Sequence, residues 1–508
     1  MISVGGYELD SEQVHAATSE HKNILVVAGA GSGKTTTIVG RIKYLINEKN
    51  INSNEILCIS FTNASVDSLK DKIVEEIGTN IDVYTFHRLS LNILKDNNLN
   101  YKLCIPDLLE YLIDEYFNVL ILNDIDMMYI VLKHYHIFTL KIDVIKKYKK
   151  ILKSANFSKL KKLIAKFIRL MKTNGYNISE FARFYNHKIK TKNFYLLKII
   201  LIIYQLYQSE LESNGEIDFD DMIIKATNVV KEIGIKNKYK YIIIDEFQDS
   251  SLVRFNLIKS IIEKTNASLF VVGDDFQSIY KFAGCNLNIM LDFEKNFDDT
   301  EILKISNTYR NSQELVDIAG SFVMKNKKQI RKNLKSNKHL KNPVRIIKYK
   351  NYIDDFKKLI EEIGNKKILI LGRNNRDIYD LIDNDYIIDK NGNVLYKPKN
   401  IAMKYMTVHK SKGLEEDVVI VINLKDDIMG FPSKLEDNKI LEIVSPKIDK
   451  YPYSEERRLF YVAITRTKSI VYLYVPYANK SIFVDEIKKI VNISKVSRKK
   501  WFSSIIFF

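Results

Sequence analysis

One stretch of the sequence combines the residue types that hold the phosphates of a nucleotide. Residues 24–36 read ILVVAGAGSGKTT, which predicts a buried strand, a glycine-rich turn and the start of a helix. In such a turn the backbone N–H groups face a phosphate, Lys34 reaches the β- and γ-phosphates, and the Thr35 hydroxyl binds Mg²⁺. The usual pattern has glycine at position 28, where this chain has Ala28. The residues predicted to hold the nucleotide here are Ala28, Gly29, Ala30, Gly31, Ser32, Gly33, Lys34, Thr35 and Thr36.

Two acids follow a second apolar run, in the stretch KYIIIDEFQDSS at residues 240–251. Neighbouring carboxylates at the end of a buried strand repel each other, and one pKa rises, unless a cation or a reacting water uses them. We therefore predict that Asp245 binds Mg²⁺ and that Glu246 polarises an attacking water. Together with the glycine-rich turn, this pair predicts hydrolysis of a nucleoside triphosphate.

A third stretch, LFVVGDDFQSIYKFAGC at residues 269–285, begins like a buried strand and continues through Gln277, Tyr280 and Phe282. Flat aromatic rings can stack on nucleic-acid bases of any sequence, because every base has a π-face. The alternative is that Tyr280 and Phe282 are ordinary core residues. On the first interpretation, one short segment connects a nucleotide site to a nucleic acid.

The elements that must position these residues are predicted by six short, continuous apolar runs. They lie at residues 24–28, 56–61, 241–244, 269–272, 367–371 and 418–422. Such runs are typical of strands buried on both faces of a parallel sheet, and the helical-period stretches between them predict a doubly wound α/β architecture. Residues from about 91 to 213 contain no such run, and a second set of strands begins near residue 343. We therefore expect two α/β cores with an all-helical domain inserted into the first.

The composition is that of a globular protein of several domains, with 508 residues of which 46% are hydrophobic. We find no apolar run long enough to cross a membrane and no signal peptide in MISVGGYELDSEQ, so we expect a cytoplasmic protein. Cys58, Cys104 and Cys285 lie far apart, which indicates neither disulfides nor a zinc site.

The formal charge of +17 indicates a polyanionic partner such as nucleic acid. Residues 141–172 hold twelve Lys and Arg against one acid, and residues 321–341 hold eight and no acid. The alternative for each run is a solvated helix face. The richness of the chain in Lys, Asn, Ile and Tyr is also typical of an AT-rich coding sequence.

A series of further segments resembles, in order, the motifs of one known family. They are LDSEQVHAA, CISFTNASVDSLKDKI, VYTFHRLS, IDFDDMI, NTYRNS, MTVHKSKGLEEDVVIV and EERRLFYVAITRTK. With the three stretches above, the chain resembles a superfamily 1 DNA helicase of the UvrD/Rep/PcrA type over nearly its whole length. The resemblance implies two RecA-like cores and a helicase that uses ATP and Mg²⁺ to move 3′ to 5′ on single-stranded or forked DNA.

The resemblance also implies roles in the ATP site. Gln13 and Tyr309 would contact the adenine, Glu415 the ribose, and Gln277 and Arg310 the γ-phosphate, with Arg466 as the arginine finger. Arg310 and Arg466 belong to the second core and the glycine-rich turn to the first. Hydrolysis would therefore require the two cores to close on ATP.

The DNA path is implied in the same way. Tyr280 and Phe282 would stack on bases, and the remaining residues implied to line the strand are Phe61, Thr62, Asn63, Thr85, Phe86, His87, Thr407, His409 and Ser411. Relatives usually have Trp at position 282 and Arg at 283, where this chain has Phe282 and Ala283, so the stacking is expected to be weaker. Thr36 stands where relatives often place an Arg that packs on the adenine, which loosens the expected nucleotide preference.

The largest departure is the length between Arg373 and Met406, about thirty residues where relatives carry a whole accessory domain. We expect a small helix and the hairpin DYIIDKNGNVLY there, with the accessory domain absent or vestigial over about 374–405. The expected units are a first core at 1–90 and 214–300, a helical insertion at 91–213, a second core at 301–490 and a tail at 491–508.

This compact plan resembles the helicase-like subunits of bacterial anti-phage systems such as Gabija, in which a nuclease is encoded separately. A nuclease partner is therefore one expectation, in DNA repair or anti-phage defence, and the tail WFSSIIFF could dock on it or pack on the second core. Three readings stay open from sequence: a translocating DNA helicase, a sensor of ATP and DNA that switches a partner nuclease, and an RNA helicase.

Overall fold

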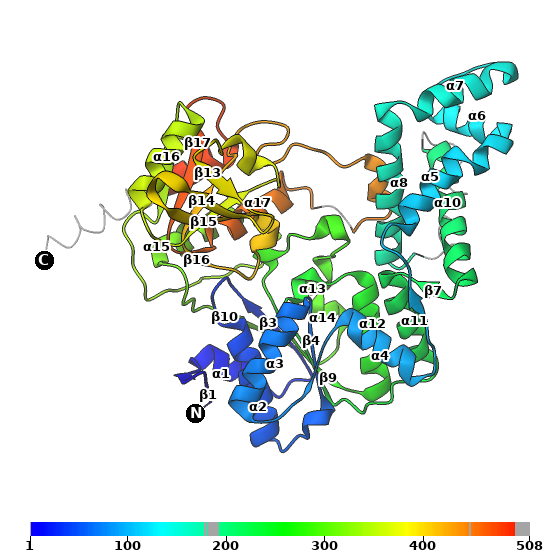
Figure 1. Ribbon diagram of the computed structural model, residues 1–508. Coiled ribbons are helices and arrows are strands. Elements are labelled where there is room, and N and C mark those ends of the chain that lie inside the picture. The colour runs from blue at the N-terminus through cyan, green and yellow to red at the C-terminus, as the bar shows by residue number, and fades with distance from the viewer. Residues whose placement is uncertain (1, 177–178, 180–192, 447–448, 493–508) are drawn as a thin grey trace, which may run out of the picture.

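The computed structural model describes residues 2–176, 179, 193–446 and 449–492 (Figure 1). The expected tail sequence WFSSIIFF lies outside these residues. None of the helices in the described ranges combines the length and the apolar character that crossing a lipid bilayer requires.

The first core is a six-stranded sheet in which all neighbouring strands are parallel. Its strands, in spatial order, are β10 (Thr300–Ile305), β3 (Asn23–Ala28), β9 (Ser268–Gly273), β8 (Tyr241–Ile244), β4 (Ile56–Ser60) and β5 (Asp82–Thr85). β3 and β4 are buried along their whole length, because apolar side chains on both faces meet packed helices. The flanking helices are α1 (Ser11–Thr18), α2 (Lys34–Asn47), α3 (Asn63–Ile77), α4 (Phe86–Asp96), α11 (Phe219–Glu232), α12 (Leu252–Thr265), α13 (Asn288–Leu291) and α14 (Phe293–Asn296).

The second core is a seven-stranded sheet with one antiparallel edge. Its spatial order is β11 (Val344–Tyr349), β17 (Thr467–Pro476), β16 (Glu416–Val421), β12 (Ile368–Gly372), β15 (Ile401–Thr407), β14 (Asn393–Tyr396) and β13 (Tyr386–Ile388). The first five strands are parallel, and β14 runs antiparallel to both of its neighbours. The helices of this core include α15 (Gln313–Val323), α16 (Tyr352–Ile363) and α17 (Ser454–Ile464), and residues 482–492 are helical as well. The prediction of two α/β cores with parallel sheets is confirmed, and the antiparallel strands of the second sheet are those of the predicted hairpin.

The segment between β12 and β15 is small, as its length predicted. It holds a short 3₁₀ turn, Asp377–Asp380, and the hairpin β13–β14. The hairpin extends the second sheet by pairing with β15, and the side chains of Tyr386, Val394 and Tyr396 are buried against it. These residues therefore form an edge of the second core and not a separate domain.

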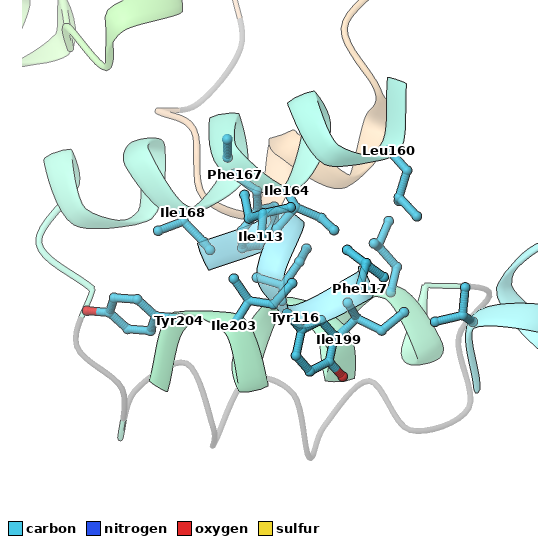
Figure 2. Close-up of a cluster of buried hydrophobic side chains, with 14 of the residues drawn as sticks. Ile113, Tyr116, Phe117, Leu160, Ile164, Phe167, Ile168, Ile199, Ile203 and Tyr204 are labelled. Atoms are coloured by element: carbon cyan, nitrogen blue, oxygen red, sulfur yellow. The ribbon is translucent and has the colours of Figure 1, made fainter. Parts of the chain in front are cut away.

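The helical insertion has a hydrophobic core of its own. Its described helices are α5 (Leu108–Asn118), α6 (Ile125–His134), α7 (Val144–Leu152), α8 (Ala155–Thr173) and α10 (Phe194–Ser213). Side chains of α5, α8 and α10 converge on one cluster (Figure 2). A two-stranded parallel ladder, β6 (Lys102–Leu103) with β7 (Glu216–Ile217), closes the base of the insertion. The expectation of a region with helices alone therefore misses one short strand, β6.

Two unit boundaries differ from the expected ones. Helix α4 packs with α11 in the core of the first sheet, so the insertion begins after Asp96 and not near residue 91. Strand β10 pairs with β3, so the first core extends beyond residue 300 to Ile305.

One segment of the second core crosses to the insertion. Residues 437–444, which we call the strap, lie between β16 and α17 and include the 3₁₀ turn Lys439–Ile443. Ile440, Leu441 and Val444 are buried in the insertion's hydrophobic cluster, and the Asn174 side-chain amide donates to the Val444 carbonyl at 2.9 Å. In Figure 1 the strap lies beside α8. The insertion is thus held by both cores.

Several cations of the basic run at 141–172 form ion pairs within the protein. Within α8, Lys161 pairs with Asp114, Lys166 with Asp437 of the strap, and Lys172 with Asp218 and Asp221. Lys172 is almost wholly buried between its two acids. These cations join α8 to its neighbours, whereas the lysines of α7 remain largely exposed.

Candidate functional site

The glycine-rich turn joins β3 to α2, as the sequence predicted. Gly31 and Gly33 have φ values of 71° and 77°, in the left-handed region that glycine adopts without strain. A Cβ atom at Gly31 would lie 2.5 Å from the Cβ of Arg310, so only glycine allows this approach of the second half of the chain. Lys34 opens helix α2, which directs the backbone N–H groups of its first turn toward the turn.

Gln13 is held against this turn. It lies in the first turn of α1, where its amide oxygen accepts from the Asp10 backbone N–H at 3.1 Å and completes a capping box. The amide nitrogen donates to the Ser32 carbonyl at 3.1 Å. Tyr309 lies close by, with its hydroxyl donating to Asp10 at 2.7 Å and its ring half exposed. The two residues expected at the adenine are therefore joined through one residue, Asp10.

The two acids after β8 meet the lysine of the turn. The ammonium nitrogen of Lys34 lies 3.4 Å from the Glu246 carboxylate, and the Asp245 carboxylate accepts from the Glu246 N–H at 2.8 Å. Glu246 has a φ of 50°, an unfavourable value for a residue with a side chain, and such strain occurs often at functional sites.

The protonation of the pair is set by burial and by two lysines. Burial and the neighbouring Glu246 charge raise the pKa of Asp245 to about 6. Burial would also raise the pKa of Glu246, but Lys34 and Lys412 outweigh it and hold that pKa well below its ordinary value. Glu246 is thus a carboxylate at neutral pH. Asp245 and the Thr35 hydroxyl are oxygen donors of the kind that Mg²⁺ prefers, and the raised pKa of Asp245 is that of a buried acid short of positive charge, so these residues fit the ion.

Gln277 and Arg466 are brought together across the two cores. Gln277 follows β9 of the first core, and Arg466 lies between α17 and β17 of the second. The Arg466 guanidinium donates to the Gln277 side-chain oxygen at 3.1 Å and is 1% exposed. Burial and then the nearby charge of Arg310 lower the pKa of Arg466 to about 9. The contacts described for the buried Arg466 guanidinium are to neutral oxygens, and a polyphosphate would supply the negative charge that pairs with it.

Residues that follow β10 also contact the glycine-rich turn. Thr308 donates from its hydroxyl to the Ala30 carbonyl at 2.7 Å, and the Tyr309 N–H donates to the Gly31 carbonyl at 2.9 Å. Arg310 forms an ion pair with Glu415. Glu415, expected at a ribose, therefore uses its carboxylate on Arg310 and on Lys468 in this structure.

Apolar contacts join the two cores at the same place. Ala30, Phe276 and Ile279 of the first core are buried in the hydrophobic cluster of the second. The two cores are therefore in direct contact beside the glycine-rich turn.

Three rings lie next to each other where the segment 269–285 leaves the nucleotide site. The Phe282 ring is 5.4 Å from the His409 ring and 6.1 Å from the Tyr280 ring, and the Tyr280 hydroxyl donates to the His409 carbonyl. Phe282 is 51% exposed, whereas Tyr280 is half-buried. Burial lowers the pKa of His409 to about 4, so its ring is neutral at physiological pH. Phe282 is thus not a core residue, and its exposed ring can take a stacking partner.

Phe282 lines a cavity of about 1020 Å³ between the first core and the insertion. Phe219 lies on the wall formed by the first core, and α5 and α8 supply the opposite wall, including Lys162 and Arg169. The lining also includes Glu110, Asp114, Asp218 and Asp220, and Arg169 pairs with Glu110. The exposed rings of Phe219 and Phe282 are therefore the feature of this cavity that suits a nucleic-acid strand.

The other residues expected along a DNA path divide into two groups. Thr62, Asn63, Thr85 and His87 lie at the N-terminal ends of α3 and α4 beside the half-buried ring of Phe61, where Thr62 and Thr85 cap their helices. Phe86, Thr407 and Ser411 are buried, with exposed fractions of 3%, 8% and 0%. Phe86 packs in the core of the first sheet, and the Ser411 hydroxyl donates to the Val408 carbonyl. Their side chains have no surface for a strand in this structure, which corrects the expectation for these three residues.

Three cations of the site were missed from the sequence. Lys412 pairs with Glu246 and Asp249, Arg458 donates to the Ser278 carbonyl at 2.6 Å, and Lys332 pairs with Asp274 and Asp275. Lys412 and Arg458 lie inside two of the segments that resemble family motifs, so the sequence could have indicated that they belong to the site. No sequence signal distinguished Lys332, because it is one of eight cations in the basic run at 321–341.

Comparison with known proteins gives two matching family models. The model described as UvrD/REP helicase N-terminal domain matches residues 9–298, and the one described as UvrD-like helicase C-terminal domain matches residues 388–480. DNA helicase IV of Escherichia coli K12 is 26% identical over 506 residues, which cover 95% of this chain and 70% of that protein.

Two further relatives are matched over shorter ranges. A probable DNA helicase II homolog of Mycoplasma capricolum is 30% identical over 344 residues, covering 65% of this chain and 43% of that protein. The ATP-dependent DNA helicase PcrA of Staphylococcus epidermidis is 27% identical over 334 residues, covering 64% of this chain and 41% of that protein. The matches to these two proteins thus span less than half of their length.

Proposed function

The chain belongs to the UvrD/Rep family of superfamily 1 helicases, and from that premise we propose that it is an ATP-dependent DNA translocase and helicase. The proposal includes movement 3′ to 5′ on single-stranded or forked DNA. The observation that carries it is the contact between Gln277 and Arg466, which joins the two cores beside Lys34 and Glu246.

The ATP site would work as follows. Lys34 and the N–H groups of the glycine-rich turn bind the phosphates, while Gln13 and Tyr309 lie at the adenine end. Thr35 and Asp245 would hold Mg²⁺, which neutralises phosphate charge when it is bound. Glu246, kept ionised by Lys34 and Lys412, orients the attacking water and accepts its proton.

The second core completes this site. Arg466 and Arg310 supply positive charge to the γ-phosphate as it is transferred, which is the term with the largest effect on such reactions. Because both arginines lie beyond β10 and the phosphate-binding turn lies in the first core, hydrolysis depends on the closed arrangement of the two cores.

Coupling to DNA follows from the short distance along the chain between Gln277 and Phe282. A change at Gln277 when the γ-phosphate leaves is transmitted through one turn of backbone to Tyr280 and Phe282. Base stacking on such rings tolerates any sequence, which suits an enzyme that moves along a strand.

Replacing Phe282 with alanine is expected to weaken binding of single-stranded DNA by roughly 5- to 150-fold, since one stacked base is worth about 1–3 kcal/mol. Fluorescence anisotropy with a labelled oligonucleotide measures this affinity. Tyr379→Ala is the matched control, because Tyr379 is an exposed ring of the second core outside the cavity. Equal affinities for the two variants would remove Phe282 from the DNA path.

A second candidate function is favoured by the hairpin β13–β14, which stands where the family resemblance places an accessory domain. In this alternative the protein senses ATP and DNA and switches a separate nuclease, in DNA repair or anti-phage defence, without processive unwinding. The intact set of Glu246, Gln277, Arg310 and Arg466 favours turnover and hence the helicase.

A labelled fork with a 3′ single-stranded arm separates the two functions. The helicase releases the labelled strand in the presence of ATP and Mg²⁺, and a fork with only a 5′ arm is not opened. ATP hydrolysis stimulated by DNA without strand release would support the sensor. The absence of DNA-stimulated hydrolysis would contradict both.

A further inference from the structure

Among the residues that the structure describes, four cations later in the chain contact the segment Asp274–Tyr280. We call this segment the Gln277 loop. Lys412 donates to the Gln277 carbonyl, Arg458 to the Ser278 carbonyl and Arg466 to the Gln277 side chain. The fourth cation, Lys332, lies in residues 324–343, which connect α15 to β11. The mechanism above uses Arg466 and Lys412 and leaves Lys332 without a role.

Lys332 is deeply buried. Its side chain is 2% exposed, and those of its partners Asp274 and Asp275 are 0% exposed. The ammonium nitrogen contacts both carboxylates, at 2.5 Å from Asp275, and lies 3.7 Å from the centre of the Phe276 ring. A buried ammonium costs several kcal/mol unless it is paired, so this position is maintained by specific contacts and not by solvation.

Neighbours of Lys332 fix the same acids. The Ile330 N–H and the Gln329 side-chain amide both donate to Asp275 at 2.8 Å. One oxygen of Asp275 therefore orders the backbone of residues 329–330, while Lys332 itself reaches Asp274. The geometry of Asp274 thus depends on a residue 58 positions later in the chain.

Asp274 transmits this contact to the catalytic groups. One of its oxygens accepts from Lys332 and from the Phe276 N–H, and the other accepts from the Gln277 side-chain nitrogen at 2.6 Å. With its nitrogen held in this way, the Gln277 amide directs its oxygen at Arg466. A continuous series of polar contacts therefore runs from Lys332 to Arg466.

We propose that Lys332 is a positioning residue for ATP hydrolysis: it holds the Asp274 carboxylate against Gln277 and so keeps the Gln277 oxygen directed at Arg466. This inference rests on the proposed function. Without Lys332, two adjacent buried carboxylates would lose the one ammonium that pairs with both, and their repulsion shifts the loop or leads one of them to take up a proton. Either change releases the Gln277 amide, which can then turn its nitrogen toward the Arg466 guanidinium, where two donors oppose each other.

The test replaces Lys332 with methionine, which keeps the length of the side chain and removes the charge. The kcat of DNA-stimulated ATP hydrolysis is expected to fall about 100-fold, the scale of loss from a small misplacement of catalytic groups. The KM for ATP and the affinity for a fluorescent ATP analogue should stay unchanged, because Lys332 does not touch the glycine-rich turn. Lys335→Met is the matched control on the same segment, since the Lys335 side chain is exposed.

A second variant guards against loss of folding. Lys332→Met combined with Asp275→Asn keeps the net charge of the buried group at one negative, as in the natural protein. We expect the same loss of kcat, because Asp274 still lacks its cation. Turnover by this double variant or by Lys332→Met at the level of Lys335→Met would overturn the inference.

Hydrogen–deuterium exchange decides the structural part without any turnover. The peptide that covers the Gln277 loop should exchange faster in Lys332→Met than in Lys335→Met, and equal rates would overturn the inference. Natural protein that hydrolyses no ATP in the presence of DNA would overturn the proposed function, and the exchange rates would still decide the role of Lys332.

Discussion

Replacing Arg466 with alanine is expected to lower DNA-stimulated ATP hydrolysis by about 10³- to 10⁵-fold, the effect typical of an arginine that stabilises phosphoryl transfer. Its guanidinium is buried beside Gln277 and has a lowered pKa of about 9, so it lies in a site that is short of negative charge. The variant loses this cation where the transition state gains charge. Binding of single-stranded DNA should change little, because Arg466 contacts none of the rings that line the cavity.

Arg457→Ala supplies the control for this loss. Arg457 is also a buried arginine of the second core, but it makes a two-pronged contact with Glu486 away from the nucleotide site. Its replacement lowers the stability of that core without removing a group from the reaction. Steady-state assays measure ATP hydrolysis by both variants, and fluorescence anisotropy with a labelled oligonucleotide measures their affinity for DNA. Equal loss of hydrolysis in the two variants, or loss of DNA binding together with hydrolysis, would contradict the role of Arg466.

Replacing Glu246 with glutamine is expected to reduce hydrolysis by about 10²- to 10⁴-fold, the usual contribution of a positioned general base. Glutamine has the same shape but cannot accept the proton of the attacking water. ATP binding should be kept or strengthened, because Lys34 and Lys412 lose a competing negative charge. Single-turnover hydrolysis and binding of a fluorescent ATP analogue measure the two effects separately.

The expected product of this change is a protein that holds ATP and DNA without turning over. Glu263→Gln on an exposed position of α12 is the control with the same chemical change. A parallel loss of ATP binding and hydrolysis in Glu246→Gln would indicate that Glu246 supports the fold of the site and does not act on water.

Local patterns predicted most of the strands that carry the site. The run ILVVA became β3 and YIII became β8 because both are buried on two faces, which a continuous apolar run describes well. Strand β10 was missed because it lies at the edge of its sheet, where Ile305 is the one fully buried residue of TEILKI. Strand β15 alternates between buried and exposed residues, so a search for continuous apolar runs passes over it.

Predictions about the site succeeded where a role depends on neighbours in sequence and failed where it depends on distant contacts. The turn with Lys34 and the acids after β8 each lie within a few residues, and the structure places Lys34 beside Glu246. Whether the side chain of Phe86 or Ser411 reaches the surface depends on how distant elements pack against it. The local sequence around each residue does not show that packing. Lys332 looked like one more solvated cation, and only the fold reveals that it pairs with Asp274, 58 positions away, and with Asp275.

Because of the strap, each of the three units of the molecule contacts the other two. The insertion joins the first core at the β6–β7 ladder and through the pairing of Lys172 with Asp218 and Asp221. The two cores meet at Gln277 and Arg466, and residues 437–444 join the insertion to the second core. None of the first core, the second core and the insertion can then move without changing its contacts with the other two. A rotation of the two cores relative to each other would therefore have to bend residues 437–444 or carry α8 with them.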